Sequence, residues 1–154
     1  MMNDRIFQGK WICDPRFAAI APLDVFHREH DEPHFGGDHP AELTNVHALF
    51  RRTFVLRKEP GRYLLRVSAD DYAKLSVNGR FFAQGPTPGY PDSYYSHELD
   101  VTDRLHEGVN TILAHVYYQG FINRVWGSGD LRMGLIADLV APDGSGILST
   151  DSSW

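Results

Sequence analysis

The 154-residue sequence contains a single cysteine, Cys13, so no disulfide bond can form within the chain. It has no apolar run near the roughly 20 residues that a membrane-spanning helix needs. Its first residues, MMNDRIFQGKW, lack the apolar segment of a signal peptide. These absences predict a cytoplasmic protein without a membrane partner, and leave an extracellular location open if a leader was trimmed from the chain.

The sequence also lacks a cluster of positive charge. Its 15 Lys and Arg residues are scattered, and the formal net charge is −5. Binding to nucleic acid depends largely on clustered cations, so we expect no nucleic-acid partner. A chain of this length, with 42% hydrophobic and 23% charged residues, is typical of one globular domain that can bury a core.

Helical patterns are missing as well. No amphipathic helical pattern of ten or more residues occurs, and nothing repeats at a fixed period. Short runs of period two occur instead, separated by turn residues. The expected strands are 7–13, 46–56, 62–69, 72–77, 80–84, 99–102, 111–118, 131–140 and 147–150. This pattern predicts an all-β fold, a two-sheet antiparallel β-sandwich of the jelly-roll or galactose-binding-like type, as one domain over residues 1–154.

Side-chain alternation predicts which strand faces are buried. In 46–56, Phe50 and Phe54 mark the core side. In 62–69, the core side carries Tyr63, Leu65, Val67 and Ala69. Strand 111–118 is apolar or aromatic on both faces, which predicts a central strand covered on both sides.

Asn78-Gly79 follows a run in which Ala73, Leu75 and Val77 alternate with polar residues. A type I′ turn needs positive φ at both central residues, and Asn-Gly is the pair that adopts it most readily. We therefore expect a two-residue hairpin loop here. Such a loop places Phe82 on the same face as Leu75.

Residues 14–45 form a long segment without a regular pattern, and we expect an irregular loop. Imidazole and carboxylate groups suit zinc or nickel, but the spacing matches no known motif. A solvated loop is therefore favoured, and a small metal-dependent enzyme remains an alternative. The loop's candidate ligands are His27, His30, His34 and His39, with Asp24, Glu29, Asp31, Glu32 and Asp38.

Catalytic motifs are absent too. There is no G-x-S-x-G, Cys13 has no evident His partner, and Gly127-Ser128-Gly129 lacks the strand-to-helix context of a phosphate loop. Carboxylates that a glycosidase could use are present at Asp70-Asp71, Asp100, Asp103 and Asp143. We interpret Asp70-Asp71, which precede a strand, as structural, and also Asp100, whose side chain can satisfy backbone N–H groups in the DVT turn. The sequence predicts no catalytic residue, no metal and no cofactor.

Two glycine-containing connections, 85–95 and 119–130, combine aromatic and planar polar side chains. Sugar rings have apolar C–H faces and a polar rim, so this combination is typical of carbohydrate sites. In the alternative interpretation, the aromatic side chains cap the core and Arg124 forms a structural ion pair with Asp130. The candidate carbohydrate-binding residues are Tyr90, Tyr94, Tyr95, Gln119, Asn123, Arg124, Trp126 and Asp130.

Several motifs together resemble the N-terminal β-sandwich domain of bacterial α-L-rhamnosidases. They are Asp71-Tyr72, 75–79 (LSVNG), Gly85 with Pro88-Gly89, Tyr94-Tyr95, and 100–102 (DVT) with Leu105, Gly108 and Asn110; the resemblance extends back to 50–54 and forward to 150–154.

The resemblance implies a non-catalytic accessory domain of a longer glycoside hydrolase, which helps to bind rhamnosyl-containing glycans. The catalytic carboxylates of that family belong to an (α/α) barrel that this chain lacks. The partners implied are carbohydrate and the remainder of the parent hydrolase. A purely structural scaffold that packs against the barrel is the alternative.

Overall fold

The structure is a computed structural model that describes residues 6–22, 40–57, 61–90, 93–120, 122–123, 126–141 and 143–154. The side chains of residues 41, 122, 123 and 126 are not described. The predicted histidine-rich loop, with His27, His30, His34 and His39, lies outside the described residues, as does Arg124.

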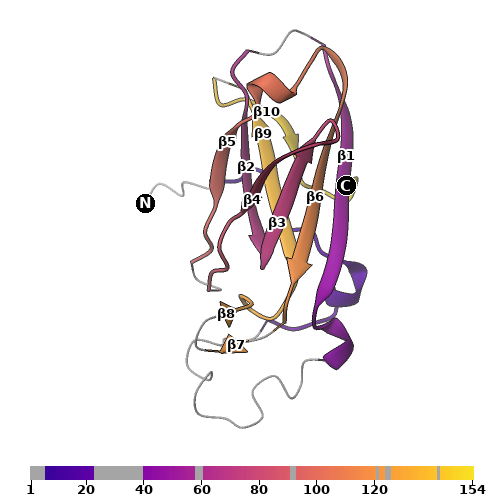
Figure 1. The fold of residues 1–154 in the computed structure, drawn as a ribbon, viewed down its shortest axis with the longest axis vertical. Coiled ribbons are helices and arrows are strands. Elements are labelled where there is room, and N and C mark those ends of the chain that lie inside the picture. The colour runs from indigo at the N-terminus through magenta and orange to yellow at the C-terminus, as the bar shows by residue number, and fades with distance from the viewer. Residues whose placement is uncertain are drawn as a thin grey trace.

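Two four-stranded antiparallel sheets pack face to face (Figure 1). The first has the order β1 (Val46–Leu56), β6 (Gly108–Tyr118), β3 (Tyr72–Val77) and β4 (Arg80–Gly85). The second has the order β10 (Gly146–Ser149), β9 (Gly134–Val140), β2 (Leu64–Asp70) and β5 (His97–Asp100). A short hairpin of β7 (Ile122–Asn123) and β8 (Trp126–Gly127) lies at one end. The predicted all-β sandwich is confirmed.

The helical elements in the described part of the chain are single 3₁₀ turns: η1 (Pro15–Phe17), η2 (Ala41–Leu43) and η3 (Thr102–Arg104). None of these helices has the length and apolarity that crossing a membrane would take. Two of the turns, η1 and η2, belong to the predicted irregular segment 14–45, which thus contains local helical turns.

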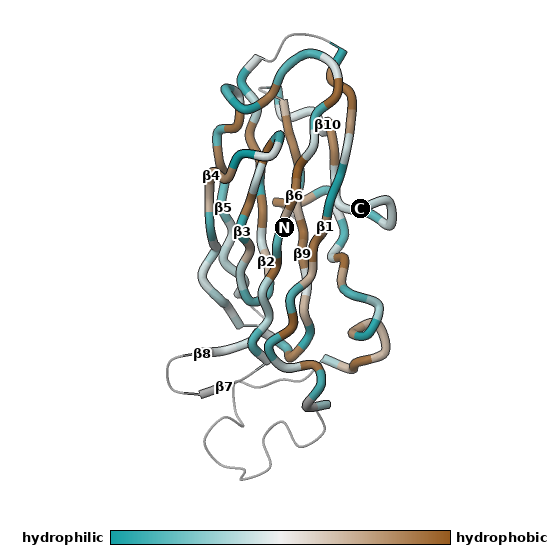
Figure 2. The backbone as a smooth tube through the Cα atoms, turned by 45° about the vertical axis from the view of Figure 1, so that its right-hand side comes forward, coloured by the Kyte–Doolittle hydropathy of each residue, from teal (hydrophilic) through white to brown (hydrophobic). Residues whose placement is uncertain are grey.

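The core lies between the sheets and follows the predicted alternation (Figure 2). Leu65, Val67 and Ala69 of β2 are at most 1% exposed, and β1 alternates between inward and solvent-facing residues over its full predicted length. Strand β6 is central, as predicted, between β1 and β3. The prediction that it is covered on both faces is wrong, because no layer in the described residues packs on its outer face and those residues remain partly exposed.

The predicted hairpin forms with the expected turn. Asn78 and Gly79 have φ values of 50° and 75°, the left-handed values of a type I′ turn. A register shift follows, so Leu75 lies opposite Ala83 rather than Phe82. Phe82 still packs against the core, as predicted.

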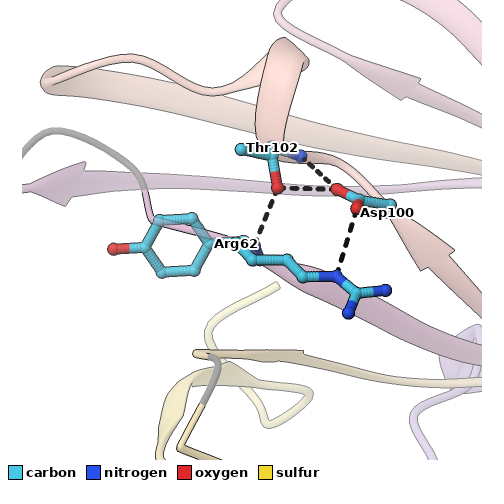
Figure 3. Close-up of polar contacts among 4 residues, drawn as sticks. Arg62, Asp100 and Thr102 are labelled. Atoms are coloured by element: carbon cyan, nitrogen blue, oxygen red, sulfur yellow. Dashed lines mark hydrogen bonds and ion pairs between the residues drawn. The ribbon is translucent and has the colours of Figure 1, made fainter.

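The DVT motif is a side-chain-supported turn that joins β5 to η3 (Figure 3). Asp100 Oδ1 accepts hydrogen bonds from Thr102 N at 3.0 Å and Thr102 Oγ1 at 2.6 Å. Thr102 Oγ1 accepts a further hydrogen bond from Tyr63 N at 2.9 Å, and Arg62 pairs with Asp100 at the surface. These contacts confirm the structural role predicted for Asp100, and Asp143 plays the same role toward Ser145 N.

The last residue of the DVT–L–G–N motif, Asn110, is fully buried. Both the oxygen and the nitrogen of its side-chain amide form hydrogen bonds. Its Oδ1 accepts hydrogen bonds from Asn78 Nδ2 at 2.9 Å and His106 N at 3.1 Å. Its Nδ2 donates to the carbonyls of His106 and Gly108. Asn110 thus ties the β3–β4 turn to the loop before β6, although the two lie about thirty residues apart.

The N-terminal segment does not form the strand predicted for 7–13. Ile12 makes one isolated bridge with Leu135, through two hydrogen bonds of 2.9 Å. Lys10 N donates to the Thr150 carbonyl, and the Asp138 carboxylate accepts hydrogen bonds from Gln8 N and Gly9 N. Side-chain and loop contacts therefore hold this segment against the second sheet, in place of a continuous ladder.

Candidate functional site

A pocket of about 540 Å³ lies at the end of the sandwich where β2 gives way to β3. The β7–β8 hairpin lies at the same end (Figure 1). Asp70 is the last residue of β2, and Met133-Gly134 lead into β9. The pocket is lined by Trp11, Ile12, Cys13, Phe17, Ala18, Asp70, Tyr94, Asp130, Arg132, Met133 and Gly134.

The N-terminal segment builds one wall of this pocket. Asp14 Oδ1 accepts a hydrogen bond from Arg16 N and so begins η1. This turn buries Phe17, whose ring meets the Tyr118 ring edge-on at 5.0 Å between centroids. Phe17 therefore anchors this wall of the pocket to the hydrophobic core.

The aromatic part of the wall is a pair, Trp11 and Tyr94. Their ring centroids are 5.0 Å apart and their planes are tilted by 52°, an arrangement that aromatic pairs favour. Trp11 also lies over Gly134, where an added Cβ would be 2.7 Å from Trp11 Cε3. Trp11 remains 44% exposed, so part of its ring is available to a ligand.

The polar floor contains a buried carboxyl group, Asp70, which is 1% exposed. Tyr94 Oη donates to its Oδ2 at 3.3 Å, whereas Oδ1 has no donor among the described residues. Burial raises the pKa of Asp70 well above its ordinary value, and the hydrogen bond and charge of Asp71 raise it further. Asp70 therefore keeps its proton to a higher pH than an exposed carboxyl group, and this proton can be donated.

Asp71 lies beside Asp70 and has a structural contact. Its Oδ2 accepts a hydrogen bond from Gln119 N at 2.6 Å, which agrees with the structural role predicted for it. Asp70 instead accepts its hydrogen bond from a side chain, that of Tyr94. Its carboxyl group faces the pocket because Gly129 leaves the space: a Cβ there would be 1.9 Å from Asp70 Oδ2.

The second charged group of the pocket is the pair Asp130–Arg132. Asp130 Oδ2 accepts hydrogen bonds from Arg132 Nε at 2.9 Å and from Arg132 Nη2, and its Oδ1 accepts one from Arg132 N. The carboxylate raises the pKa of Arg132. Arg132 therefore stays charged, and its partly exposed guanidinium group provides donors at the pocket.

Tyr94 is held in its neutral form. Burial raises the pKa of Tyr94 far above its ordinary value, and the charges of Asp70 and Asp130 act in the same direction. Its hydroxyl group can therefore both donate and accept. Together the pocket offers hydroxyl, carboxyl and guanidinium groups beside apolar and aromatic walls, which is the combination that a sugar with one apolar face needs.

The structure places two of the eight predicted site residues, Tyr94 and Asp130, in this pocket. Tyr90 and Tyr95 are 44% and 59% exposed and do not line it. Gln119 acts through its backbone, toward Asp71. Asn123 and Trp126 lie in the β7–β8 hairpin with undescribed side chains. The partner of Asp130 in the described residues is Arg132; Arg124, its partner in the alternative interpretation, lies outside the described residues.

Sequence reasoning missed Trp11, Asp70 and Arg132 as pocket residues. The sequence does show a Trp-Ile pair at 11–12 and two consecutive aspartates, Asp70-Asp71. Neither feature indicates a pocket, because both also occur in β-sandwich domains without one. Nothing in the sequence indicated that residues about sixty apart meet at one end. No group of three or more His, Cys, Asp or Glu in the described part of the chain is arranged to hold a metal ion.

These features define an antiparallel β-sandwich domain with a mixed polar and aromatic pocket at one end. No protein-family model matches the sequence, and no curated protein matches it. Solved structures do match, and they include enzymes that act as α-L-rhamnosidases.

The chain is similar to a domain of α-L-rhamnosidases. It is 32% identical to a GH78 family rhamnosidase of Bacillus sp. GL1 over 72% of this chain, with a TM-score of 0.66. It is 29% identical to an α-L-rhamnosidase from Aspergillus terreus over 76%, with a TM-score of 0.56. An α-L-rhamnosidase from Dictyoglumus thermophilum shares the fold over 99% of this chain, at 18% identity and a TM-score of 0.64. The chain covers 12%, 15% and 17% of these proteins, respectively. The predicted resemblance is confirmed.

Proposed function

We propose that this chain is a non-catalytic accessory domain of an α-L-rhamnosidase-like glycoside hydrolase, and that its pocket helps to bind rhamnosyl-containing glycans. The observation that carries the proposal is the chemistry of the pocket. L-Rhamnose is a 6-deoxy sugar, so it presents a methyl group and several hydroxyl groups. Trp11, Phe17 and Met133 match the apolar part, whereas Asp70, Tyr94 and Arg132 match the hydroxyl groups.

The carboxyl groups of the pocket support a binding role over a catalytic one. A glycosidase needs two carboxyl groups on opposite sides of the scissile bond, one of them free to act as base or nucleophile. Asp130 is held by Arg132, and Asp71 is bound to Gln119 N. This leaves Asp70, whose pKa is raised by burial, as the carboxyl group that can donate a hydrogen bond to a hydroxyl group while it is protonated.

The test is an NMR titration of isotopically labelled protein with L-rhamnose and with rhamnosylated oligosaccharides. We expect saturable shifts at the amides of Trp11, Tyr94 and Arg132. Trp11→Ala should weaken binding by about tenfold or more, equivalent to ~1.4 kcal/mol, because it removes the aromatic wall. Asp70→Ala should weaken binding by a similar factor, because it removes the carboxyl group that donates to the sugar.

Tyr95→Ala is the matched control, because Tyr95 is next to Tyr94 in sequence but does not line the pocket. If Tyr95→Ala weakens binding as much as Trp11→Ala, the exposed loop aromatic residues bind the sugar instead. An absence of shifts at tens of millimolar sugar, an affinity weaker than about −2 kcal/mol, would contradict sugar binding.

The alternative is a scaffold that packs against the rest of a hydrolase. A specific observation favours it as a second candidate: large apolar side chains, Leu49, Val55, Phe81 and Val109, are 59–68% exposed. They lie on the first sheet, where β1 and β6 place Val55 opposite Val109. A failed titration would make this scaffold the leading function.

A further inference from the structure

The outer face of the first sheet carries a cluster of ring side chains at the end near β6 Tyr118. Tyr72 and His47 lie on either side of Tyr117 as its direct cross-strand partners. The ring centroids of Tyr117 are 5.5 Å from Tyr72 and 4.8 Å from His47. His115, two residues before Tyr117 on the same face of β6, completes the cluster. None of these residues lines the candidate sugar pocket.

Within this cluster, the two imidazole rings are unusually close. His47 Nδ1 and His115 Nε2 are 3.0 Å apart, and the ring centroids are 5.1 Å apart. The two residues come from neighbouring strands in diagonal positions, because His47 is opposite Tyr117 and His115 is opposite Leu49. The backbone register of β1 and β6, an eleven-residue ladder, therefore fixes the two backbone positions from which the rings meet.

The separation matches a particular coordination geometry. Imidazole nitrogen atoms bind a divalent metal at about 2.0–2.1 Å. Two such nitrogen atoms lie ~3.0 Å apart when they occupy adjacent positions at about 90°, and ~3.4 Å apart in a tetrahedral site. The observed 3.0 Å fits adjacent positions of a tetragonal or octahedral site, the geometry that Cu²⁺ and Ni²⁺ prefer with nitrogen and oxygen ligands.

We propose that His47 and His115 form a two-imidazole chelate for Cu²⁺ or Ni²⁺ on this face, with water in the remaining positions. His47 is exposed, so water and metal can reach the pair. In the metal-free pair one ring donates its N–H to the other. On binding, that proton moves to the other nitrogen of the same ring, so both facing nitrogen atoms offer a lone pair and no net proton is lost.

The groups around the pair set its electrostatics. Lys74 lies directly opposite His115 on β3. Its positive charge repels a cation bound to the pair. Burial, the charge of His47 and the charge of Lys74 lower the pKa of His115. The hydroxyl groups of Tyr72 and Tyr117 face the same surface, and Tyr117 Oη is already bonded to Asn45 Oδ1 at 2.8 Å.

The experiment is a titration of the 154-residue chain with Cu²⁺, followed by calorimetry and by electron paramagnetic resonance. We expect one ion per chain whose spectrum shows coupling to two nitrogen atoms. His115→Gln and His47→Gln should each weaken binding by at least about tenfold, because loss of an outer-shell partner alone costs 10–100-fold. Lys74→Gln should tighten binding, because it removes an opposing charge.

Two controls separate this site from the other histidines. His106→Gln should leave the affinity unchanged. A variant with His27, His30, His34 and His39 all replaced by Gln should keep the two-nitrogen signal. The proposal is overturned if that four-fold variant abolishes the signal, or if His115→Gln and His47→Gln, shown by circular dichroism to be folded, bind Cu²⁺ as the parent chain does.

Discussion

At the scale of single residues, the pocket depends on glycines that leave room for polar side chains. Gly129 has a positive φ of 40°, and a side chain there would collide with Asp70 and with Tyr94 Oη. The carboxyl group of Asp70 therefore fits in a largely buried position at the pocket. Its buried position has a consequence for the pH dependence of folding.

We expect the protein to lose stability as the pH rises above about 4. The pKa of Asp70 is raised well above the 3.8 of the unfolded chain, so between these two values the folded state binds more protons. The free energy of unfolding should then fall with pH by up to ~1.4 kcal/mol per pH unit. Urea unfolding at several pH values measures this slope.

Asp70→Asn should remove most of that slope, because the amide cannot ionise. Asp143→Asn is the control, since Asp143 is exposed and its pKa is lowered by Ser145; its effect is confined to pH values below about 4. An unchanged slope in Asp70→Asn would mean that another buried group carries the pH dependence.

At the scale of elements, the DVT–L–G–N motif joins the β3–β4 hairpin to the loop that leads into β6. Asn110 makes its bonds to the turn Asn78-Gly79 and to the backbone of 106–108 in the same buried position. The motif therefore fixes how β6 enters the first sheet, beside β3.

Asn110→Ala should destabilise the fold by roughly 2–4 kcal/mol, because it leaves several buried polar groups without partners. Chemical denaturation gives this value directly. Thr53→Ala removes a single exposed hydrogen bond, to Thr111 Oγ1 at 3.1 Å, and should cost less than about 0.5 kcal/mol. Similar losses in the two variants would show that the Asn110 network does not stabilise this connection.

At the scale of the whole molecule, the N-terminal segment closes one edge of the sandwich. Phe17 enters the core against Tyr118, which lies at the end of β6, about a hundred residues later in the chain. The pocket wall and the core are thus one packed unit, and loss of Phe17 should affect both.

Phe17→Ala should lower the free energy of unfolding by about 3–5 kcal/mol, as for other buried phenylalanines. Phe81→Ala is a matched control, because Phe81 is 59% exposed on β4 and should cost less than about 1 kcal/mol. Equal costs would indicate that the N-terminal segment is not packed on the core in solution.

The sequence by itself determined most of the strands and, for β1 and β2, the face that each buries. Period-two alternation predicted 46–56 with its correct bounds, and the Asn-Gly pair predicted the type I′ turn. These features are local: φ preferences and side-chain alternation act within a few residues. The turn at Asp100 was predictable for the same reason, since the hydrogen bonds that shape it run to Thr102, two residues on.

Only the tertiary structure decided where the pocket lies and which residues form it. Trp11, Asp70 and Arg132 meet because the N-terminal segment bridges β9 and because β2 ends beside the start of β9. The sequence could not distinguish the single bridge at Ile12 from a full strand over 7–13. A short run of apolar residues does not indicate how many of them form backbone hydrogen bonds with a neighbouring strand. Burial of Asp70 likewise depends on Gly129 and Tyr94 from other segments. Contacts between segments far apart in the sequence position the pocket side chains and shift their pKa values. Side-chain alternation and secondary-structure propensity, which act over a few residues, do not specify such contacts.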